Sequence, residues 1–192
     1  GKTPAPPKAE PEGKAQRNFT DPESRILKTK DGYIQGYNAQ AAVDAQAQII
    51  VAQSLANSMS DQDQLVPLID GIEDNLGRKP KEASADAGYC SEANLAALAA
   101  REVGAYLATG RAKHPAEGRP KGPLVRAMRD KLKRAGRRTR YRLRKQVVEP
   151  VFGQIKQARG FRQFLLRGIE KVKAEWALIC TAHNLTKLTR PA

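Results

Sequence analysis

The order of apolar patterns along the chain constrains its fold more strongly than any other feature. Residues 25–58 contain short strand-like runs on either side of a polar turn at Asp44, which predicts a hairpin. A helix-like stretch, a short strand, a second helix and another short strand follow, and the C-terminal third is helical. Strands that alternate with helices in this order indicate a mixed α/β domain.

Cap residues and apolar spacing locate the helices more closely. In residues 61–76 leucine and isoleucine recur at steps of three and four, and Gly77 stands where a C-cap belongs. Ser91 is a suitable N-cap for a helix that runs to about Arg101. Further helices are expected over residues 124–134, 141–158 and 170–188, and short strands over 81–85 and 105–107. In the last helix, Val172, Trp176, Ile179, His183 and Leu185 fall near one face.

The N-terminal residues differ in composition from the rest of the chain. Residues 1–24 alternate proline with lysine and glutamate and offer few side chains to a core, so we expect a linker there. One domain should occupy residues 25–192, with a basic loop and helix inserted at about residues 110–140. No secretory signal or membrane span is expected, and Cys90 and Cys180 cannot form a disulfide framework, which favours a cytoplasmic location.

Charge is the strongest compositional signal. The 34 lysines and arginines exceed the 20 acids and give a net charge of +14. Between Arg101 and Lys145 there are 16 basic residues against three acids. A one-sided positive field binds phosphates without reading sequence, so the pattern favours a nucleic acid as partner. The alternative is a solvated basic surface that keeps the chain soluble.

Two acids are candidates for chemistry. Asp86 follows the predicted strand over residues 81–85 and precedes a glycine turn, where α/β sheets bind ligands. Glu149 lies between apolar and basic residues, next to Pro150, which would kink or restart the helix. The alternatives are a turn aspartate that binds nearby backbone N–H groups and a surface ion pair of Glu149 with Lys145 or Lys156. If Asp86 and Glu149 converge, they could hold two Mg²⁺ ions that act on a phosphodiester.

At these residues the chain resembles the DDE transposases of bacterial insertion sequences. The resemblance rests on Asp86-Ala-Gly-Tyr89 and on Tyr141, Arg144, Glu149 and Lys156, which match a Y-R-E-K signature. It extends to Asn38-Ala-Gln-Ala-Ala-Val-Asp44, Arg167-Gly168 and His183-Asn184-Leu185 and covers residues 18 to 189. Four residues separate Arg144 from Glu149, where the commonest signature has three.

The resemblance implies an RNase H-like mixed sheet flanked by helices and DNA transposition by metal-dependent phosphodiester cleavage and strand transfer. Asp86 and Glu149 would be the catalytic ligands of Mg²⁺ or Mn²⁺. Double-stranded DNA, both transposon ends and target, would be the partner, with a homodimer or larger assembly in the complex. The DNA-binding residues would be Tyr141, Arg144, Lys145, Lys156, Arg137 and Arg138, with Lys156 otherwise a plain solvated lysine.

The first acid of the family's triad has no clear counterpart in the chain. Asp44 is an internal candidate, although an aspartate at a hairpin turn usually has a structural role. Asp61 is suited to N-capping. Our interpretation is that the first strand and its acid lie upstream and that this chain is the C-terminal part of a longer transposase, inactive when isolated. The rival is a non-catalytic DNA-binding remnant, in which replacing Asp86 or Glu149 would change no activity.

Overall fold

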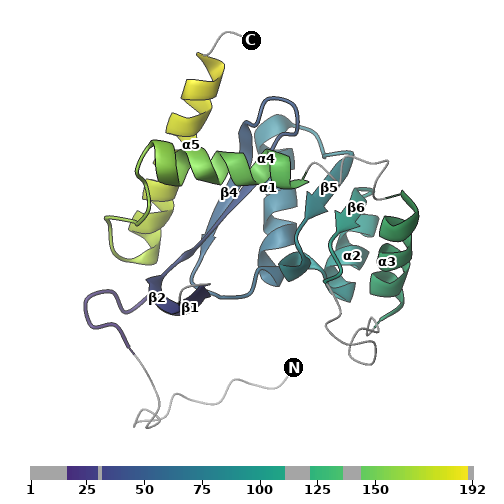
Figure 1. Ribbon diagram of the computed structural model, residues 1–192, viewed down its shortest axis with the longest axis horizontal. Coiled ribbons are helices and arrows are strands. Elements are labelled where there is room, and N and C mark those ends of the chain that lie inside the picture. Colours follow the sequence, from purple (N-terminus) through teal and green to yellow (C-terminus); the bar gives the residue numbers. More distant parts are fainter. Residues whose placement is uncertain (1–16, 30–31, 111–121, 136–143, 190–192) are drawn as a thin grey trace.

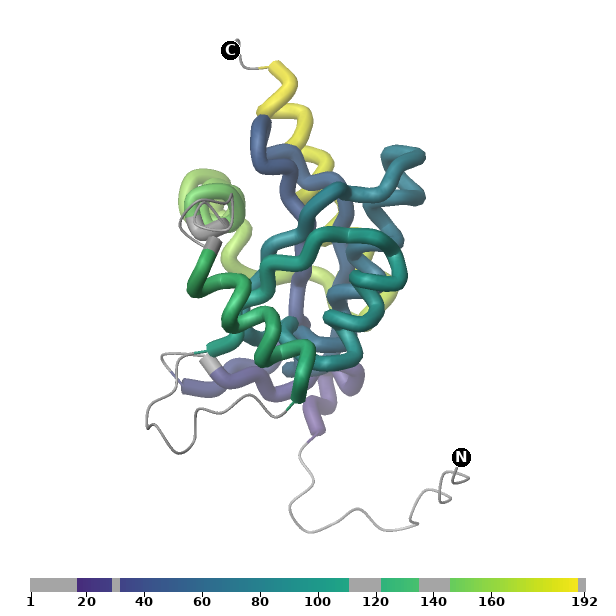
Figure 2. Tube along the Cα trace, turned by 90° about the vertical axis from the view of Figure 1, so that its right-hand side faces the viewer, coloured from purple at the N-terminus to yellow at the C-terminus, as the bar shows by residue number. Residues whose placement is uncertain are grey.

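The computed structural model describes residues 17–29, 32–110, 122–135 and 144–189, and these residues form a mixed α/β domain (Figure 1). Figures 1 and 2 place α3 and α5 on opposite sides of it. Its elements are β1 (Arg25–Thr29), β2 (Gly32–Gly36), β3 (Asn38–Val43), β4 (Ile50–Ala56), η1 (Gln62–Gln64), α1 (Leu65–Leu76), β5 (Glu82–Ala85), η2 (Ala87–Tyr89), α2 (Glu92–Ala100), β6 (Gly104–Leu107), α3 (Pro123–Ala135), α4 (Arg144–Gly153), η4 (Gln154–Ala158) and α5 (Ile169–Leu188).

The described strands pair two by two instead of forming the single mixed sheet that was expected. β1 pairs with β2 and β3 with β4, both antiparallel, while β5 and β6 are parallel. No backbone ladder joins these pairs within the described residues. Side chains connect β3 to the turn after β5 instead, because the hydroxyl of Tyr89 donates to Oε1 of Gln40.

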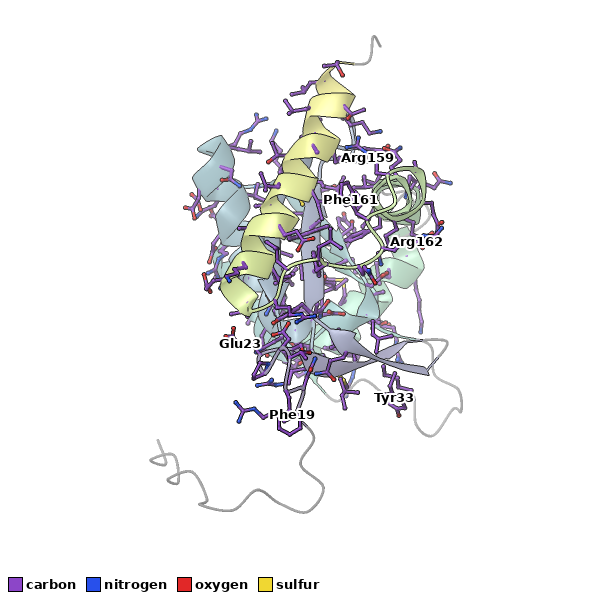
Figure 3. The ribbon with its side chains drawn as sticks, turned by 90° about the vertical axis from the view of Figure 1, so that its left-hand side faces the viewer. Phe19, Glu23, Tyr33, Arg159, Phe161 and Arg162 are labelled. Atoms are coloured by element: carbon purple, nitrogen blue, oxygen red, sulfur yellow. The ribbon has the colours of Figure 1, made fainter. Side chains whose placement is uncertain are left out.

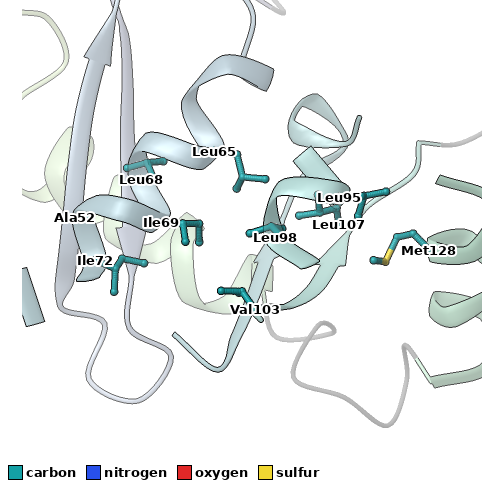
Figure 4. Packing of buried hydrophobic residues seen from close by; sticks show 10 residues of the cluster. All are labelled: Ala52, Leu65, Leu68, Ile69, Ile72, Leu95, Leu98, Val103, Leu107 and Met128. Atoms are coloured by element: carbon teal, nitrogen blue, oxygen red, sulfur yellow. The ribbon is translucent and has the colours of Figure 1, made fainter. Parts of the chain in front are cut away.

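One hydrophobic cluster spans both the β3–β4 and the β5–β6 sheets (Figure 4). α1 and α2 supply most of its side chains, and Leu98 and Leu107 are fully buried. Ser91 caps α2 by accepting from the backbone N–H of Asn94, and Gly77 ends α1 in the left-handed conformation, as the sequence predicted. α1 therefore holds the two sheets in one core although they share no ladder.

A second cluster lies on the other face of the β3–β4 hairpin and is formed with α4, η4 and α5. Trp176 is its centre: its ring stacks on Phe152, meets Phe164 edge-on, and its Nε1 donates to the carbonyl of Gln40 at 3.0 Å. The side chain of Asn184 pairs with both the N–H and the carbonyl of Ile50 at 2.8 Å. These bonds fix α5 against the hairpin.

Two sequence expectations about this cluster need correction. Leu185 is 57% exposed, and Cys180 takes the buried place instead. The reason is geometric: at about 100° per residue, Leu185 lies far from the face of Val172. In addition, α4 runs through Pro150 without ending there and continues into η4, which is a π-helix.

The residues that precede β1 pack against the domain. Asp21 and Ser24 are buried, and Asp21 accepts from the hydroxyl of Tyr37 and from the N–H of Gly168. The carboxylate of Glu23 accepts from the N–H of Ile169, at the start of α5. Burial and the bond to Asp21 raise the pKa of Tyr37 to about 12. The remainder of the expected linker, residues 1–16, lies outside the described residues.

Within the described part of the chain, no helix combines the length and the apolar character needed to cross a membrane.

We expect His183 to make the stability of the fold depend on pH. It is fully buried, its Nε2 lies 3.0 Å from the carbonyl of Gln48, and its Nδ1 has no partner. Burial lowers its pKa, as do the charges of Arg159 and Lys187.

As pH falls, the unfolded state therefore takes up a proton at this histidine before the folded state does. The free energy of unfolding should keep its full value above pH 6.5 and decline below it. Urea titrations between about pH 7.5 and 5 would show this slope, and His183→Gln should flatten it; an equal slope in the variant would contradict the assignment.

Candidate active site beside β3 and β5

Asp86 stands where the sequence placed it, at the C-terminal end of β5. It is exposed and precedes η2, and its side chain makes no cap hydrogen bond to that turn. The turn is held by its backbone, in which the N–H of Tyr89 donates to the carbonyl of Asp86. The C-terminal end of a strand is where α/β sheets bind ligands.

Asp61 lies beside this turn, and its role differs from the expected one. Its side chain does not cap η1. Oδ1 instead accepts from the side-chain amides of Asn38 at 2.8 Å and Gln40 at 2.9 Å. Charge-assisted bonds to two amides hold the carboxylate in place and tie the start of α1 to β3.

Tyr89 connects Asp61, Asp86 and β3. Its hydroxyl donates to Gln40, and its carbonyl accepts from the side chain of Asn94 at 2.8 Å. Burial raises the pKa of Tyr89 well above its ordinary value, and the charges of Asp61 and Asp86 add to the effect. The phenol thus stays protonated and remains a donor, which helps to fix the turn that carries Asp86.

Gly88 completes this arrangement by its lack of a side chain. A Cβ at this position would lie 2.6 Å from Oδ2 of Asp61, closer than real contacts allow. The partnership of Asn38, Gln40, Asp61 and Tyr89 was not expected from the sequence. A usable signal was present, because Asn38 and Gln40 alternate along β3 and so point to one face of the strand.

Glu149 belongs to a different layer. It is exposed on α4, whose buried neighbour Val151 packs on the face of the β3–β4 hairpin opposite to α1. Lys156 is exposed in η4, with its Nζ 5.6 Å from the ring centroid of Phe152. No ion pair joins Glu149 to Lys156 among the described residues.

Half of the six predicted DNA-binding residues lie outside the described residues. Arg137, Arg138 and Tyr141 lie outside the described residues. Arg144 and Lys145 begin α4, and only their backbone is described.

The described residues alone do not form a complete metal site. No group of three or more histidine, cysteine, aspartate or glutamate side chains gathers in ranges 17–29, 32–110, 122–135 and 144–189. The charges of Asp61 and Asp86 both act on Tyr89 and raise its pKa, and Oδ1 of Asp61 is engaged by two amides. Oδ2 of Asp44 accepts from the N–H groups of Gln46 and Ala47 within the hairpin turn, which is the structural role typical of a turn aspartate.

The burial of both cysteines argues against a reactive thiol. Burial raises the pKa of Cys180 to about 12 and also raises that of Cys90. Both are free, and neither lies in a cluster of metal-binding side chains among the described residues.

The comparison with protein families matches residues 9–185 to the transposase DDE domain. No curated protein matches the chain. The family match covers the described elements from β1 to η4 and α5 up to residue 185, and it includes Asp61, Asp86 and Glu149.

Proposed function

The chain belongs to the transposase DDE family, and on that premise we propose that it is the C-terminal catalytic part of an insertion-sequence transposase. The implied reaction is cleavage of phosphodiesters at transposon ends followed by strand transfer into a target. The observation that carries the proposal is the family match over residues 9–185 together with Asp86 exposed at the end of β5. The family implies an RNase H-like fold, and the mixed α/β architecture agrees with it.

Asp86 and Glu149 are the proposed metal-binding carboxylates. A divalent cation, Mg²⁺ or Mn²⁺, would supply charge stabilisation to the attacking and leaving oxygens of the phosphodiester. Tyr89, Gln40 and Asn94 would keep the Asp86 turn in one conformation through their hydrogen bonds. The share of the described residues is therefore to hold the turn that carries Asp86.

The basic residues are proposed to hold the substrate. Lys156, Tyr141 and Arg144 would position DNA near the cleaved bond. Arg137, Arg138 and Lys145 would contact its backbone, where cations fix register and orientation without reading sequence. The high net charge of +14 supports a polyanionic partner.

We further propose that a strand outside the described residues supplies the remaining carboxylate. Two facts support this. The β3–β4 and β5–β6 sheets share a hydrophobic cluster but no ladder, and the described residues hold no cluster of three potential ligands. A strand that pairs with a free edge of one sheet would satisfy backbone groups and bring a new side chain close to Asp86.

The test compares two proteins: residues 1–192 and the same chain extended by the coding sequence immediately upstream. We expect both to bind DNA, and only the extended protein to cleave and join transposon ends in Mg²⁺. Products are separated on denaturing gels, where joined strands distinguish transposition from simple nuclease activity. Robust cleavage by residues 1–192 that Asp44→Ala abolishes would overturn the proposed strand and place Asp44 in the catalytic set. Binding without cleavage by both proteins would favour the non-catalytic remnant.

A further inference from the structure

The segment that follows η4 exposes apolar side chains although it is closely held. In this segment, residues 159–167 and called the 159–167 loop below, Phe161 is 41% and Leu165 75% exposed. Figure 3 labels Arg159, Phe161 and Arg162 beside the helix formed by α4 and η4. The loop follows directly on the helix that carries Glu149 and Lys156.

Hydrogen bonds from three directions fix the conformation of the 159–167 loop. The N–H of Phe161 donates to the carbonyl of Ile155 at 3.1 Å, and Nε of Arg162 donates to the carbonyl of Lys156 at 3.3 Å. The carboxylate of Glu175 on α5 accepts from the N–H groups of Leu165 and Leu166 at 2.8 and 2.9 Å. The exposed side chains therefore stand on a rigid support.

Phe164 shows that the loop could have buried its aromatic residues. Its ring is half-buried and meets Trp176 edge-on, with centroids 6.3 Å apart. Phe161, three residues earlier, keeps 41% of its surface exposed instead. Gly160 precedes it with a φ of +76°, a conformation that favours glycine and turns the chain at this point. The backbone turn at Gly160 therefore sets the position of Phe161.

The charge around Phe161 identifies the class of partner. Residues 156–167 contain Lys156, Arg159, Arg162 and Arg167 and no acid. The carboxylate of Glu175, which reaches the loop from α5, is engaged by the N–H groups of Leu165 and Leu166. An exposed aromatic ring among cations suits a ligand that offers both phosphates and flat bases, since bases stack on aromatic side chains while arginines neutralise the backbone. A purely apolar protein partner would leave these charges without a counterpart.

We propose that the 159–167 loop contacts DNA at an unpaired or partly unstacked base, with Phe161 against the base and Arg159 and Arg162 on the flanking phosphates. The inference rests on the proposed function for its partner, DNA, and adds a specific site to it. Aromatic side chains that enter a base step unstack it and stabilise bent or opened DNA. The loop would thereby favour opened DNA over continuous duplex.

The experiment measures the affinity of residues 1–192 for two fluorescent DNAs, a continuous duplex and the same duplex with an unpaired tail. We expect the unsubstituted chain to prefer the tailed DNA by about tenfold, the effect of one stacked base. Phe161→Ala should abolish the preference and leave duplex affinity unchanged, whereas Phe161→Trp should keep it. The double variant Arg159→Gln, Arg162→Gln should weaken binding to both DNAs and reduce the salt slope by about 2.

Matched controls come from elsewhere on the surface. Phe19→Ala removes an aromatic ring that is 91% exposed and should leave the preference intact. Arg78→Gln with Lys79→Gln removes two exposed charges after α1 and should leave the salt slope nearly unchanged. Circular dichroism of each variant confirms that the fold is retained.

The outcomes separate the two levels of the proposal. A preference for tailed DNA that survives Phe161→Ala would overturn the role of the loop and leave the proposed function standing. If the unsubstituted chain binds neither DNA, the proposed function itself fails. If Phe161→Ala changes only self-association in sedimentation, the loop is a protein interface and the inference is wrong.

Discussion

In the chain extended by its upstream coding sequence, which we expect to cleave DNA, Asp86→Asn should slow cleavage of transposon ends by about a thousandfold or more. The substitution keeps the size of the side chain and removes the negative charge that is proposed to bind the divalent ion. Charge stabilisation of this kind contributes several kcal/mol to the transition state, and each 1.36 kcal/mol corresponds to about tenfold in rate. Single-turnover cleavage of labelled DNA ends in Mg²⁺ measures the effect. Glu149→Gln should produce a loss of similar size.

The control for this prediction is Asp44→Asn. Asp44 is also an aspartate at the end of a strand, but its carboxylate is engaged in the hairpin turn. Its replacement should leave cleavage within a few-fold of the original rate. DNA affinity should be unchanged or slightly higher for Asp86→Asn, because a negative charge near phosphates has been removed. Cleavage by Asp86→Asn at the original rate would exclude Asp86 from the chemistry.

Trp176→Ala should lower the free energy of unfolding by about 4 kcal/mol, the scale of large aromatic truncations in cores. Trp176 is 3% exposed and joins α5, α4 and β3 through its contacts with Phe152, Phe164 and Gln40. Its loss leaves a cavity and an unpaired carbonyl in the same place. Urea denaturation followed by circular dichroism measures the change.

Two variants divide the contribution of Trp176. Trp176→Phe keeps most of the apolar volume and removes the hydrogen bond to Gln40, so its cost should be about 1–3 kcal/mol from the unsatisfied carbonyl and reduced packing. Leu178→Ala on the same helix replaces a side chain that is exposed and should cost within about 0.5 kcal/mol. If Trp176→Ala were no more harmful than Leu178→Ala, the second cluster would not depend on the indole.

Local patterns predicted most elements of the fold. The steps of three and four in residues 61–76, the N-cap Ser91 and the C-cap Gly77 each depend on residues close in sequence, and the structure confirms them. Leu185 was expected on the buried face of α5 but is exposed, because its angular position around the helix was not compared strictly with that of its neighbours. The pairing of strands could not be predicted in the same way, because it depends on contacts between residues far apart along the chain.

The candidate site was predictable in part for the same reason. Asp86 was found because a strand end beside a glycine turn is a local pattern, and the structure places it there. Asp61 was interpreted as a cap because its partners, Asn38 and Gln40, lie more than 20 residues earlier in the chain. Whether Asp86 and Glu149 act together stays a prediction that the cleavage experiments address.

The carboxylates of Asp21 and Glu23 join the segment that precedes β1 to the start of α5. They bind the N–H groups of Gly168 and Ile169, about where α5 begins, although almost 150 residues separate the partners. A truncated chain that starts at β1 would lack both carboxylates and leave the first turn of α5 without these acceptors. A proteolytic cut before residue 25 should therefore also loosen α5. The segment before β1 and the last helix would then lose their ordered structure together.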